Sequence, residues 1–237
     1  MNLLRELGAS TDPLPLADLS RRLNLGKATV RRFLLSLEAL GYVQRDARGR
    51  YSASAALFGL VARPVLAVGP DIAASLRDLA AETGTAISLG VLRDREVLYL
   101  WREPAGSAAG VALGEGARLP AHATAIGKVL LSQLAPAAVE EIYAGAAPEA
   151  FTPRTIASLP LLLGALQEIR RQGWALSDGE LEEGLTAAAV PVYDRSGSLR
   201  WALNASSAGH RLAPAAFATD VVPALLRAAG RIGALDG

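Results

Sequence analysis

A short run of basic side chains near the N-terminus is the first group whose types and spacing could do chemistry. Lys27, Arg31 and Arg32 follow one another at helical spacing. At about 100° per residue, Ala28 and Arg32 point away from the apolar stripe that starts at Val30. An arginine on such a face can bond a guanine edge with two hydrogen bonds, and a small alanine lets the helix approach a groove closely. This pattern predicts contact with double-stranded DNA.

Two helices are expected to position these side chains. A first helix over 16–23 has one apolar face, residues 24–26 form a tight turn, and the second helix ends at Gly41, which readily adopts the left-handed conformation of a helix C-terminus. The second helix should bury Val30, Phe33, Leu34, Leu37 and Leu40. Residues 3–7 indicate only a short helix beneath this pair. We therefore expect this unit either to take packing from a partner chain or to have a start codon further upstream.

A hairpin is expected after the second helix. Residues 42–45 and 50–52 read as two short strands joined by the turn 46–49. Helix, turn, helix and hairpin in this order are typical of a winged helix-turn-helix, whose second helix enters the major groove while wing arginines neutralise phosphates. We expect DNA contacts from Lys27, Ala28, Thr29, Arg31, Arg32, Arg48 and Arg50. One such unit reads few base pairs, so a dimer on a pseudo-palindromic site is expected.

The distribution of charge favours DNA over the alternative, a small-molecule binding or interaction module whose winged helix contacts protein. Residues 1–66 carry ten Lys or Arg against five Asp or Glu, whereas the rest of the chain carries fourteen against eighteen. A nearly neutral chain therefore combines a basic N-terminal unit with an acidic body. That asymmetry is expected when one unit faces phosphates and the other does not.

The loop 114–120 and the helix expected over 122–134 form a second candidate site. A helix N-terminus offers free N–H groups and a partial positive charge, so it can hold a carboxylate, and the small Ala123 and Ala125 leave room for one. The alternative is that these alanines only let the helix pack on a sheet, with His122 capping its own helix. Both interpretations are compatible with the residues alone.

Two strands further along the chain are expected to complete that pocket. If the hairpin formed by 187–193 and 199–206 pairs in register, Ala187, Ala188 and Ala189 lie near Asn204 and Ser206. The pocket would then have walls of small side chains and two polar groups. Four acidic residues are expected at the mouth of the pocket, mostly as a solvated loop or as partner contacts: Asp178, Glu180, Glu182 and Glu183. One of them could accept a hydrogen bond from a ligand hydroxyl.

The chain has few of the side chains that serve as nucleophiles, bases or metal ligands in enzymes. It has two histidines, no cysteine and no cluster of metal ligands at a recognisable spacing. Gly127-Lys128 resembles part of a phosphate loop, but the Ser or Thr that should follow is Val129, and the preceding glycine is missing. We expect no enzyme activity, no catalytic residues, no metal and no cofactor.

Strands in antiparallel hairpins with helices between them predict an α+β fold. We expect a DNA-binding domain over 1–65, a linker and entry helix over 66–83, and a ligand-binding domain over 84–237. The strands of that domain are expected over 85–92, 96–101, 109–113, 187–193 and 199–206, and its later helices over 159–172 and 214–232. Neither a signal peptide nor an apolar run long enough for a membrane is visible, which predicts a cytoplasmic protein without a membrane partner.

Three stretches resemble the IclR family of bacterial transcription regulators: 26–32 with 37–41, 118–128, and 178–191. The resemblance covers nearly the whole chain. It implies a winged helix followed by an effector domain of GAF-like fold, in which an antiparallel sheet packs against helices. It also implies dimers through the N-terminal units and, in many members, tetramers through the effector domains.

The residues 181–185, 189–192 and 202–206 are similar to the subgroup that controls β-ketoadipate pathway genes. That similarity implies a small organic acid as effector, either aromatic, such as protocatechuate or 4-hydroxybenzoate, or dicarboxylic. Thr186, where the subgroup usually has arginine, and Arg200-Trp201 depart from the pattern. Together with the pocket argument, these patterns predict effector contacts from Leu119, His122, Ala123, Thr124, Ala125, Ile126, Asp178, Leu185, Ala187, Ala188, Asn204 and Ser206.

Overall fold

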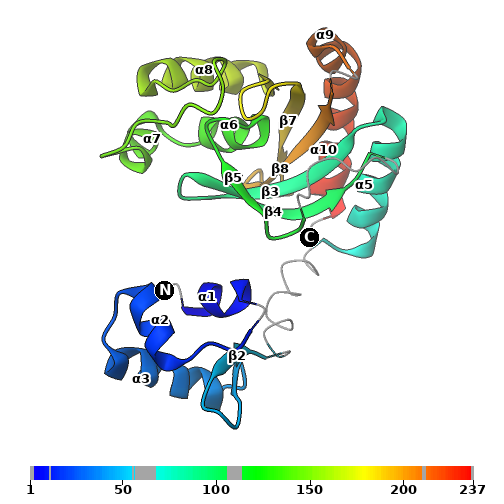
Figure 1. The fold of residues 1–237 in the computed structure, drawn as a ribbon. Coiled ribbons are helices and arrows are strands. Elements are labelled where there is room, and N and C mark those ends of the chain that lie inside the picture. The colour runs from blue at the N-terminus through cyan, green and yellow to red at the C-terminus, as the bar shows by residue number, and fades with distance from the viewer. Residues whose placement is uncertain are drawn as a thin grey trace. The chain divides into compact units, whose positions relative to one another are not determined.

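The computed structural model describes residues 3–10, 12–54, 56, 68–105, 114–209 and 212–235 (Figure 1). The chain divides into two compact units, Met1–Ala67 and Val68–Gly237, and each is described by itself. The strand expected over 109–113 lies outside the described residues.

The N-terminal unit contains three helices and a two-stranded sheet: α1 (Leu3–Ala9), α2 (Leu16–Leu23), α3 (Lys27–Ala39), β1 (Val43–Arg45) and β2 (Tyr51–Ala53). Asn24 ends α2 in the left-handed conformation, and Gly41 follows α3 with φ +76°, so the predicted turn and helix end are confirmed. The strands β1 and β2 are antiparallel, with Val43 opposite Ala53. The fold of this unit is the expected winged helix-turn-helix.

A small apolar core holds these elements together. Leu3 and Leu7 of α1 are buried against Leu19, Val30 and Leu34, so the short first helix does close the core beneath α2 and α3. The expectation for Leu40 was wrong, because this residue is 64% exposed. It caps the C-terminus of α3, where the chain turns toward the wing and the apolar stripe no longer faces the core.

The C-terminal unit is an antiparallel sheet of six strands with helices on both faces. The strand order is β5-β4-β3-β8-β7-β6. The strands are β3 (Ala86–Arg93), β4 (Glu96–Glu103), β5 (Arg118–Pro120), β6 (Ala175–Asp178), β7 (Leu185–Tyr193) and β8 (Leu199–Ala208). The helices are α5 (Pro70–Thr83), α6 (Ala125–Ser132), α7 (Pro136–Ile142), α8 (Leu159–Gln172), α9 (Pro214–Ala216), the π-helical turn η1 (Phe217–Val221) and α10 (Val222–Leu235).

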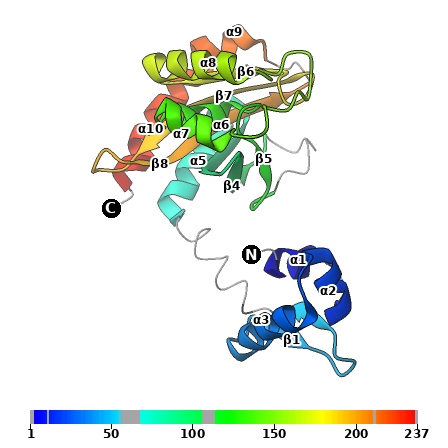
Figure 2. The same ribbon diagram turned by 90° about the vertical axis from the view of Figure 1, so that its left-hand side faces the viewer.

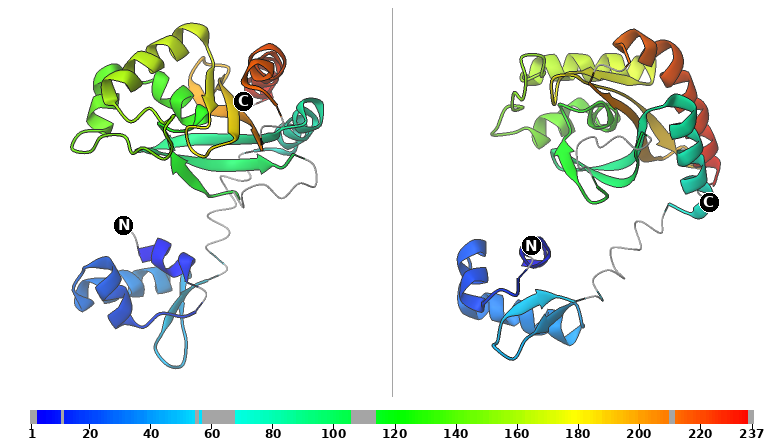
Figure 3. Two further views of the ribbon diagram at one scale, coloured as in Figure 1. Left: turned by 45° about the horizontal axis from the view of Figure 1, so that its top comes forward. Right: turned by 45° about the vertical axis from the view of Figure 1, so that its right-hand side comes forward.

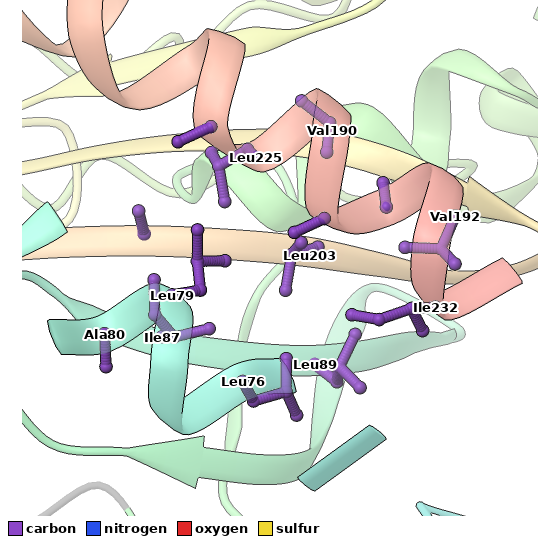
Figure 4. Packing of buried hydrophobic residues seen from close by; sticks show 14 of the residues in the cluster. Leu76, Leu79, Ala80, Ile87, Leu89, Val190, Val192, Leu203, Leu225 and Ile232 are labelled. Carbon is purple, nitrogen blue, oxygen red and sulfur yellow. The ribbon is translucent and has the colours of Figure 1, made fainter. Parts of the chain in front are cut away.

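The two faces of the sheet carry two separate apolar cores. Helices α5 and α10 lie side by side on one face, and α6, α7 and α8 cover the other, as Figures 2 and 3 show. Leu203 of β8 and Val190 of β7 point into the first core, together with Ile87 and Leu89 of β3 (Figure 4). Neighbouring strand residues such as Ala189 and Ala202 point into the second core. This alternation follows from the two-residue period of a strand.

The structure refines several boundaries of the predicted elements. The α+β class, the helix 159–172 and the two hairpins are confirmed. The helix expected over 122–134 begins only at Ala125, β5, β6 and α7 were not predicted, and the last helix is interrupted by η1. None of the helices in the described ranges has the length and apolarity needed to cross a lipid bilayer.

Candidate functional site

The outward face of α3 carries the predicted basic side chains on its surface. Lys27, Ala28, Arg31 and Arg32 are exposed, while Thr29 is half-buried. Within the described part of the chain, the side chains of Lys27, Arg31 and Arg32 make no ion pair. Gly26 precedes the helix in an extended conformation, so the first turn of α3 begins directly after the tight turn. Three cations are therefore free to meet an anionic partner.

The two wing arginines differ in their surroundings. Arg48 is exposed at the tip of the wing. Arg50 is half-buried, and its guanidinium forms an ion pair with Asp46 at 2.8 Å. Asp46 also accepts the backbone N–H groups of Arg48 and Arg50, each at 2.9 Å. The N–H of Arg50 is the largest cause of a lowered pKa for this carboxyl, which keeps it ionised. Arg48 is thus the freer cation of the wing.

A cavity of about 870 Å³ lies in the C-terminal unit, between the sheet and the N-terminal end of α6. Its walls combine many small residues with a few polar side chains and leucines. A pocket of this size can enclose a small organic molecule. Eight of the residues predicted to contact an effector line it: Leu119, Ala123, Thr124, Ala125, Leu185, Ala187, Asn204 and Ser206.

Thr124 and Gly127 position the helical end of the cavity. The hydroxyl of Thr124 accepts the N–H of Gly127 at 3.2 Å, so Thr124, and not His122, caps α6. At Gly127 a Cβ atom would lie 2.2 Å from the carbonyl oxygen of Ala121, which only a glycine avoids. The chain before α6 therefore passes directly against the helix, and residues 123–125 come to face the cavity.

The strands β7 and β8 form the floor beside it. Ala187 pairs with Ser206, and Ala189 pairs with Asn204, so the predicted register is confirmed. Ser177 of β6 continues the first of these rows, opposite Ala187. Ala188 does not line the cavity, contrary to the prediction, because it points into the core on the other face of the sheet.

Three further predicted residues lie away from the cavity. His122 is buried beneath Phe151, with ring centroids 5.8 Å apart, and its Nε2 donates to the carbonyl of Glu149 at 2.8 Å. Ile126 is one residue too far along α6 and belongs to the second apolar core. Asp178 forms an ion pair with Arg154 and accepts a 3.2 Å hydrogen bond from the Thr186 hydroxyl. These contacts give the three residues packing roles.

The acidic loop after β6 is not simply a solvated loop at the mouth of the pocket. Glu180 is buried and forms an ion pair with Lys128 of α6. The hydroxyl of Thr152 donates to the carbonyl of Gly179 at 2.6 Å, which holds the loop from outside. Glu182 lines the cavity from an exposed position, and Glu183 is exposed as expected.

Two residues of β4 line the cavity without having been predicted, Tyr99 and Arg102. In a regular strand, residues three apart point to opposite faces. Here Leu89 pairs with Trp101 but Gly90 pairs with Tyr99, so Leu100 is an extra residue and β4 contains a bulge. The bulge brings Tyr99 and Arg102 onto the same face. Nothing in the sequence of β4 marks the bulge, and the one local sign of it is Gly90 on the neighbouring strand β3.

The described residues contain no group of three or more potential metal ligands among His, Cys, Asp and Glu. The polar side chains that the described residues contribute to the cavity are instead hydroxyl groups, one amide, one guanidinium and two carboxylates. That set suits hydrogen bonding and charge pairing with an organic molecule.

Two family models match the chain. The bacterial transcriptional regulator IclR C-terminal domain matches residues 64–234, and the IclR helix-turn-helix domain matches residues 1–47. The chain belongs to the IclR family. It is thus a transcription regulator with a DNA-binding N-terminal domain and an effector-binding C-terminal domain, not an enzyme.

Relatives within the IclR family include regulators of aromatic catabolism. The HTH-type transcriptional regulator XynR of Escherichia coli is 36% identical over 86% of this chain and 82% of its own length. The Pca regulon regulatory protein of Pseudomonas putida is 33% identical over 91% of this chain and 75% of its own length. The PobR inducer-binding domain from Acinetobacter, a double mutant in complex with 3-hydroxybenzoic acid, superposes with a TM-score of 0.65 at 34% identity. It covers 70% of this chain and 98% of the PobR domain. The likeness to the β-ketoadipate subgroup is confirmed by these relatives.

Proposed function

We propose that this IclR-family regulator binds its operator through α3 and the wing, and that a small organic acid enters the 870 Å³ cavity and changes DNA binding or activation. The single observation that carries the proposal is the cavity itself, which the sheet, the first turn of α6 and the loop after β6 enclose. Ligand binding can shift the DNA-binding equilibrium only by its different affinity for the two states of the regulator.

The basic face of α3 supports direct contact with DNA. Lys27, Arg31 and Arg32 are exposed and form no ion pair among the described residues. The small side chain of Ala28 lets the helix approach the DNA closely between them. Arg32 is assigned to base reading, with Lys27, Thr29 and Arg31 around it. Arg48 and Arg50 are assigned to the backbone of the DNA. The exposure of Arg48 supports a phosphate contact more strongly than the paired Arg50 does.

The expected working unit is a dimer, or a tetramer built from dimers, on a pseudo-palindromic operator. A single helix-turn-helix unit reads too few base pairs to select one site in a genome. We assign residues 1–65 to DNA binding, 66–83 to the linker and entry helix, and 84–237 to the effector domain, in a protein that works in the cytoplasm. The entry helix α5 also packs on the sheet of the C-terminal unit, through Leu76 and Leu79.

Aromatic and dicarboxylic acids are the proposed effector classes. The PobR inducer-binding domain, at 34% identity, is described in complex with a hydroxybenzoic acid. Residues 123–125 at the start of α6 line the cavity, and a helix N-terminus attracts carboxylates.

Fluorescence anisotropy on DNA from upstream of the protein's own gene tests the proposal. Titrations across salt, with and without a panel of aromatic and dicarboxylic acids, should show saturable binding, a steep salt slope and a shift by at least one acid. Binding no tighter than to random DNA, with no acid effect, would instead favour an interaction module whose winged helix contacts protein.

A cavity-filling variant distinguishes effector binding from DNA binding in the same assay. Ala125→Leu should abolish the response to the acid while basal DNA affinity stays intact, because its side chain would occupy space lined by the wild-type alanine. Ala137→Leu, at an exposed position of α7, is the matched control and should respond normally. A normal response in Ala125→Leu would place the effector outside this cavity.

A further inference from the structure

Arg102 is the one cation among the described residues that line the cavity. It is half-buried, and the bulge in β4 turns it to the cavity face of the sheet. The one hydrogen bond of its side chain among the described residues runs from Nη1 to the hydroxyl of Ser88 at 3.3 Å. A guanidinium has five N–H donors, so most of its donors are left for another partner.

The surroundings of Arg102 make an anionic partner favourable. Burial lowers the pKa of its guanidinium below the ordinary value, so the protein environment disfavours the charge that it carries. No carboxylate among the described residues pairs with it, in contrast to Arg50, Arg118 and Arg154, each of which has an acidic partner. A carboxylate arriving in the cavity would form the charge-assisted, bidentate pair for which arginine is suited.

The register of the sheet places two polar groups in one row beside this cation. Arg102 pairs with Ser88, and Ser88 pairs with Asn204, so one row across the sheet reads guanidinium, hydroxyl and amide. The next row, two residues along, contains Ala86, Ser206, Ala187 and Ser177. Rows two residues apart are separated by about 7 Å. The row that contains Arg102 is thus cationic. The neighbouring row, at a distance that a small molecule can span, alternates the hydroxyls of Ser206 and Ser177 with alanines.

The rim of the cavity has the opposite charge. Glu115 and Glu182 line the cavity from exposed positions, and apart from Arg102 none of its other described lining residues is charged. A second carboxylate on a ligand would therefore lie either against these two glutamates or in the small-walled interior. There the partial positive charge at the start of α6 is the one favourable feature, and the described lining holds no second cation. Both placements are unfavourable, since an unpaired buried charge and like charges at short range each cost free energy.

We infer that Arg102 holds the carboxylate of the effector and that the effector is a hydroxylated monocarboxylate, not a dicarboxylate. This inference rests on the proposed function, because it assumes that the cavity is the effector site. It removes dicarboxylic acids from the proposed effector classes and assigns recognition of the ligand's charge to Arg102 of β4.

Calorimetric titration of the full chain with matched probes tests the ligand class. The probes are 4-hydroxybenzoate, its neutral analogue 4-hydroxybenzamide, and terephthalate, in which a second carboxylate replaces the hydroxyl. Gluconate and glucarate form a second pair that differs in the same way. At least one monocarboxylate should bind, and its dicarboxylate partner should bind at least tenfold more weakly. Tighter binding of a dicarboxylate, or no binding by either monocarboxylate, would overturn the class.

Variants of Arg102 test the assignment of the residue. Arg102→Gln should weaken the bound monocarboxylate at least tenfold, since hydrogen bonds to charged groups are the strong ones. Arg102→Lys should recover part of the loss. When 4-hydroxybenzoate is the binding acid, the weak affinity for 4-hydroxybenzamide should be equal in wild type and Arg102→Gln, which a distorted cavity would not allow. Arg93→Gln, at an exposed end of β3, is the matched control.

The outcomes separate this inference from the proposed function. Unchanged monocarboxylate affinity in Arg102→Gln would overturn the role of Arg102, while an acid-dependent shift of DNA binding would still support the regulator. DNA binding by ligand-free protein is measured in parallel. If it is absent or blind to sequence, the proposed function fails, whatever the calorimetry shows.

Discussion

Lys128 of α6 and Glu180 of the loop after β6 form an ion pair inside the C-terminal unit, with side chains only 3% and 10% exposed. Lys128 also donates to the carbonyl of Leu176 at 2.9 Å, while the second carboxylate oxygen of Glu180 has no partner among the described residues. Burial lowers the pKa of Lys128, and the charge of Glu180 opposes that shift. The pair ties the loop that carries Glu182 to the helix whose first turn faces the cavity.

Removing one partner of this pair should cost far more than removing both. Lys128→Met leaves a buried carboxylate unpaired and should lower the free energy of unfolding by about 3 to 5 kcal/mol, whereas Lys128→Met with Glu180→Leu should recover most of it. Urea unfolding of the three proteins measures the difference. A single variant within about 1 kcal/mol of wild type would mean that water reaches Glu180 easily.

A methyl group at Gly127 should be strongly destabilising. The added Cβ would lie 2.2 Å from the carbonyl oxygen of Ala121, and the three nearest atoms are all backbone atoms of Ala121, so no flexible side chain can give way. We expect Gly127→Ala to cost more than about 3 kcal/mol, the upper end of the range for overpacked cores. Gly164→Ala in α8 is the control, because a Cβ there meets nothing within 4 Å. It should be neutral or stabilising by about 0.5 to 1 kcal/mol. Equal melting temperatures would contradict the close approach.

Tyr99 should keep its proton far into the alkaline range. Burial raises its pKa from its ordinary value near 10 to about 12, against the opposing charge of Arg102. Between these two pH values the folded chain binds more protons than the unfolded chain, so the stability linked to Tyr99 is complete below pH 10 and is lost as the pH rises through 12. Burial of Tyr143 raises its pKa to about 12 as well.

Ultraviolet absorbance of tyrosinate follows this titration. Tyr99, Tyr143 and Tyr193, whose pKa values are all raised by burial, should ionise late, and Tyr99→Phe should remove one of them. Ionisation of every tyrosine in one step near pH 10, in protein that is still folded, would show that the side chain of Tyr99 is open to water.

Arg32→Ala should weaken binding to the cognate operator by about 1 to 3 kcal/mol and flatten the preference at one base pair. The reason is the outward position of Arg32 on α3, where it is exposed and without an ion pair among the described residues. Anisotropy with single-base operator variants measures both effects. Weakened binding with the base preference unchanged would move Arg32 to the phosphate contacts.

The two wing arginines should respond differently to substitution. Arg48→Ala should weaken binding to all sequences alike and reduce the salt slope by about one, because this exposed cation is free to neutralise a phosphate. Arg50→Ala should change the slope less, since its charge is already paired with Asp46. A larger slope change for Arg50 would mean that its pair with Asp46 opens on DNA.

The sequence predicted those parts of the fold that depend on local periodicity. The outward face of α3 and the pairing of Ala187 with Ser206 follow from the helical and strand repeats, and both are confirmed. Alternation also explains the error at Ala188, because three consecutive strand residues cannot all face one cavity.

Other parts of the site depend on contacts that no local pattern records. The bulge at Leu100 decides that Arg102 faces the cavity, and it arises where β4 meets Gly90 of the neighbouring strand. His122 looked available at a helix start, but its hydrogen bond runs to Glu149, a residue far along the chain. Such side chains are placed by tertiary packing, so their roles could not be derived from spacing.

The lengths of the two outermost strands have a consequence for how this protein behaves at high concentration. The described sheet ends in β5 and β6, of three and four residues. Pro191 lies where β7 extends past its last pairing with β6, and proline has no N–H to offer. Short, interrupted edges give another chain little to pair with. The described edges of the sheet are thereby protected against the strand-by-strand growth that leads to fibrils.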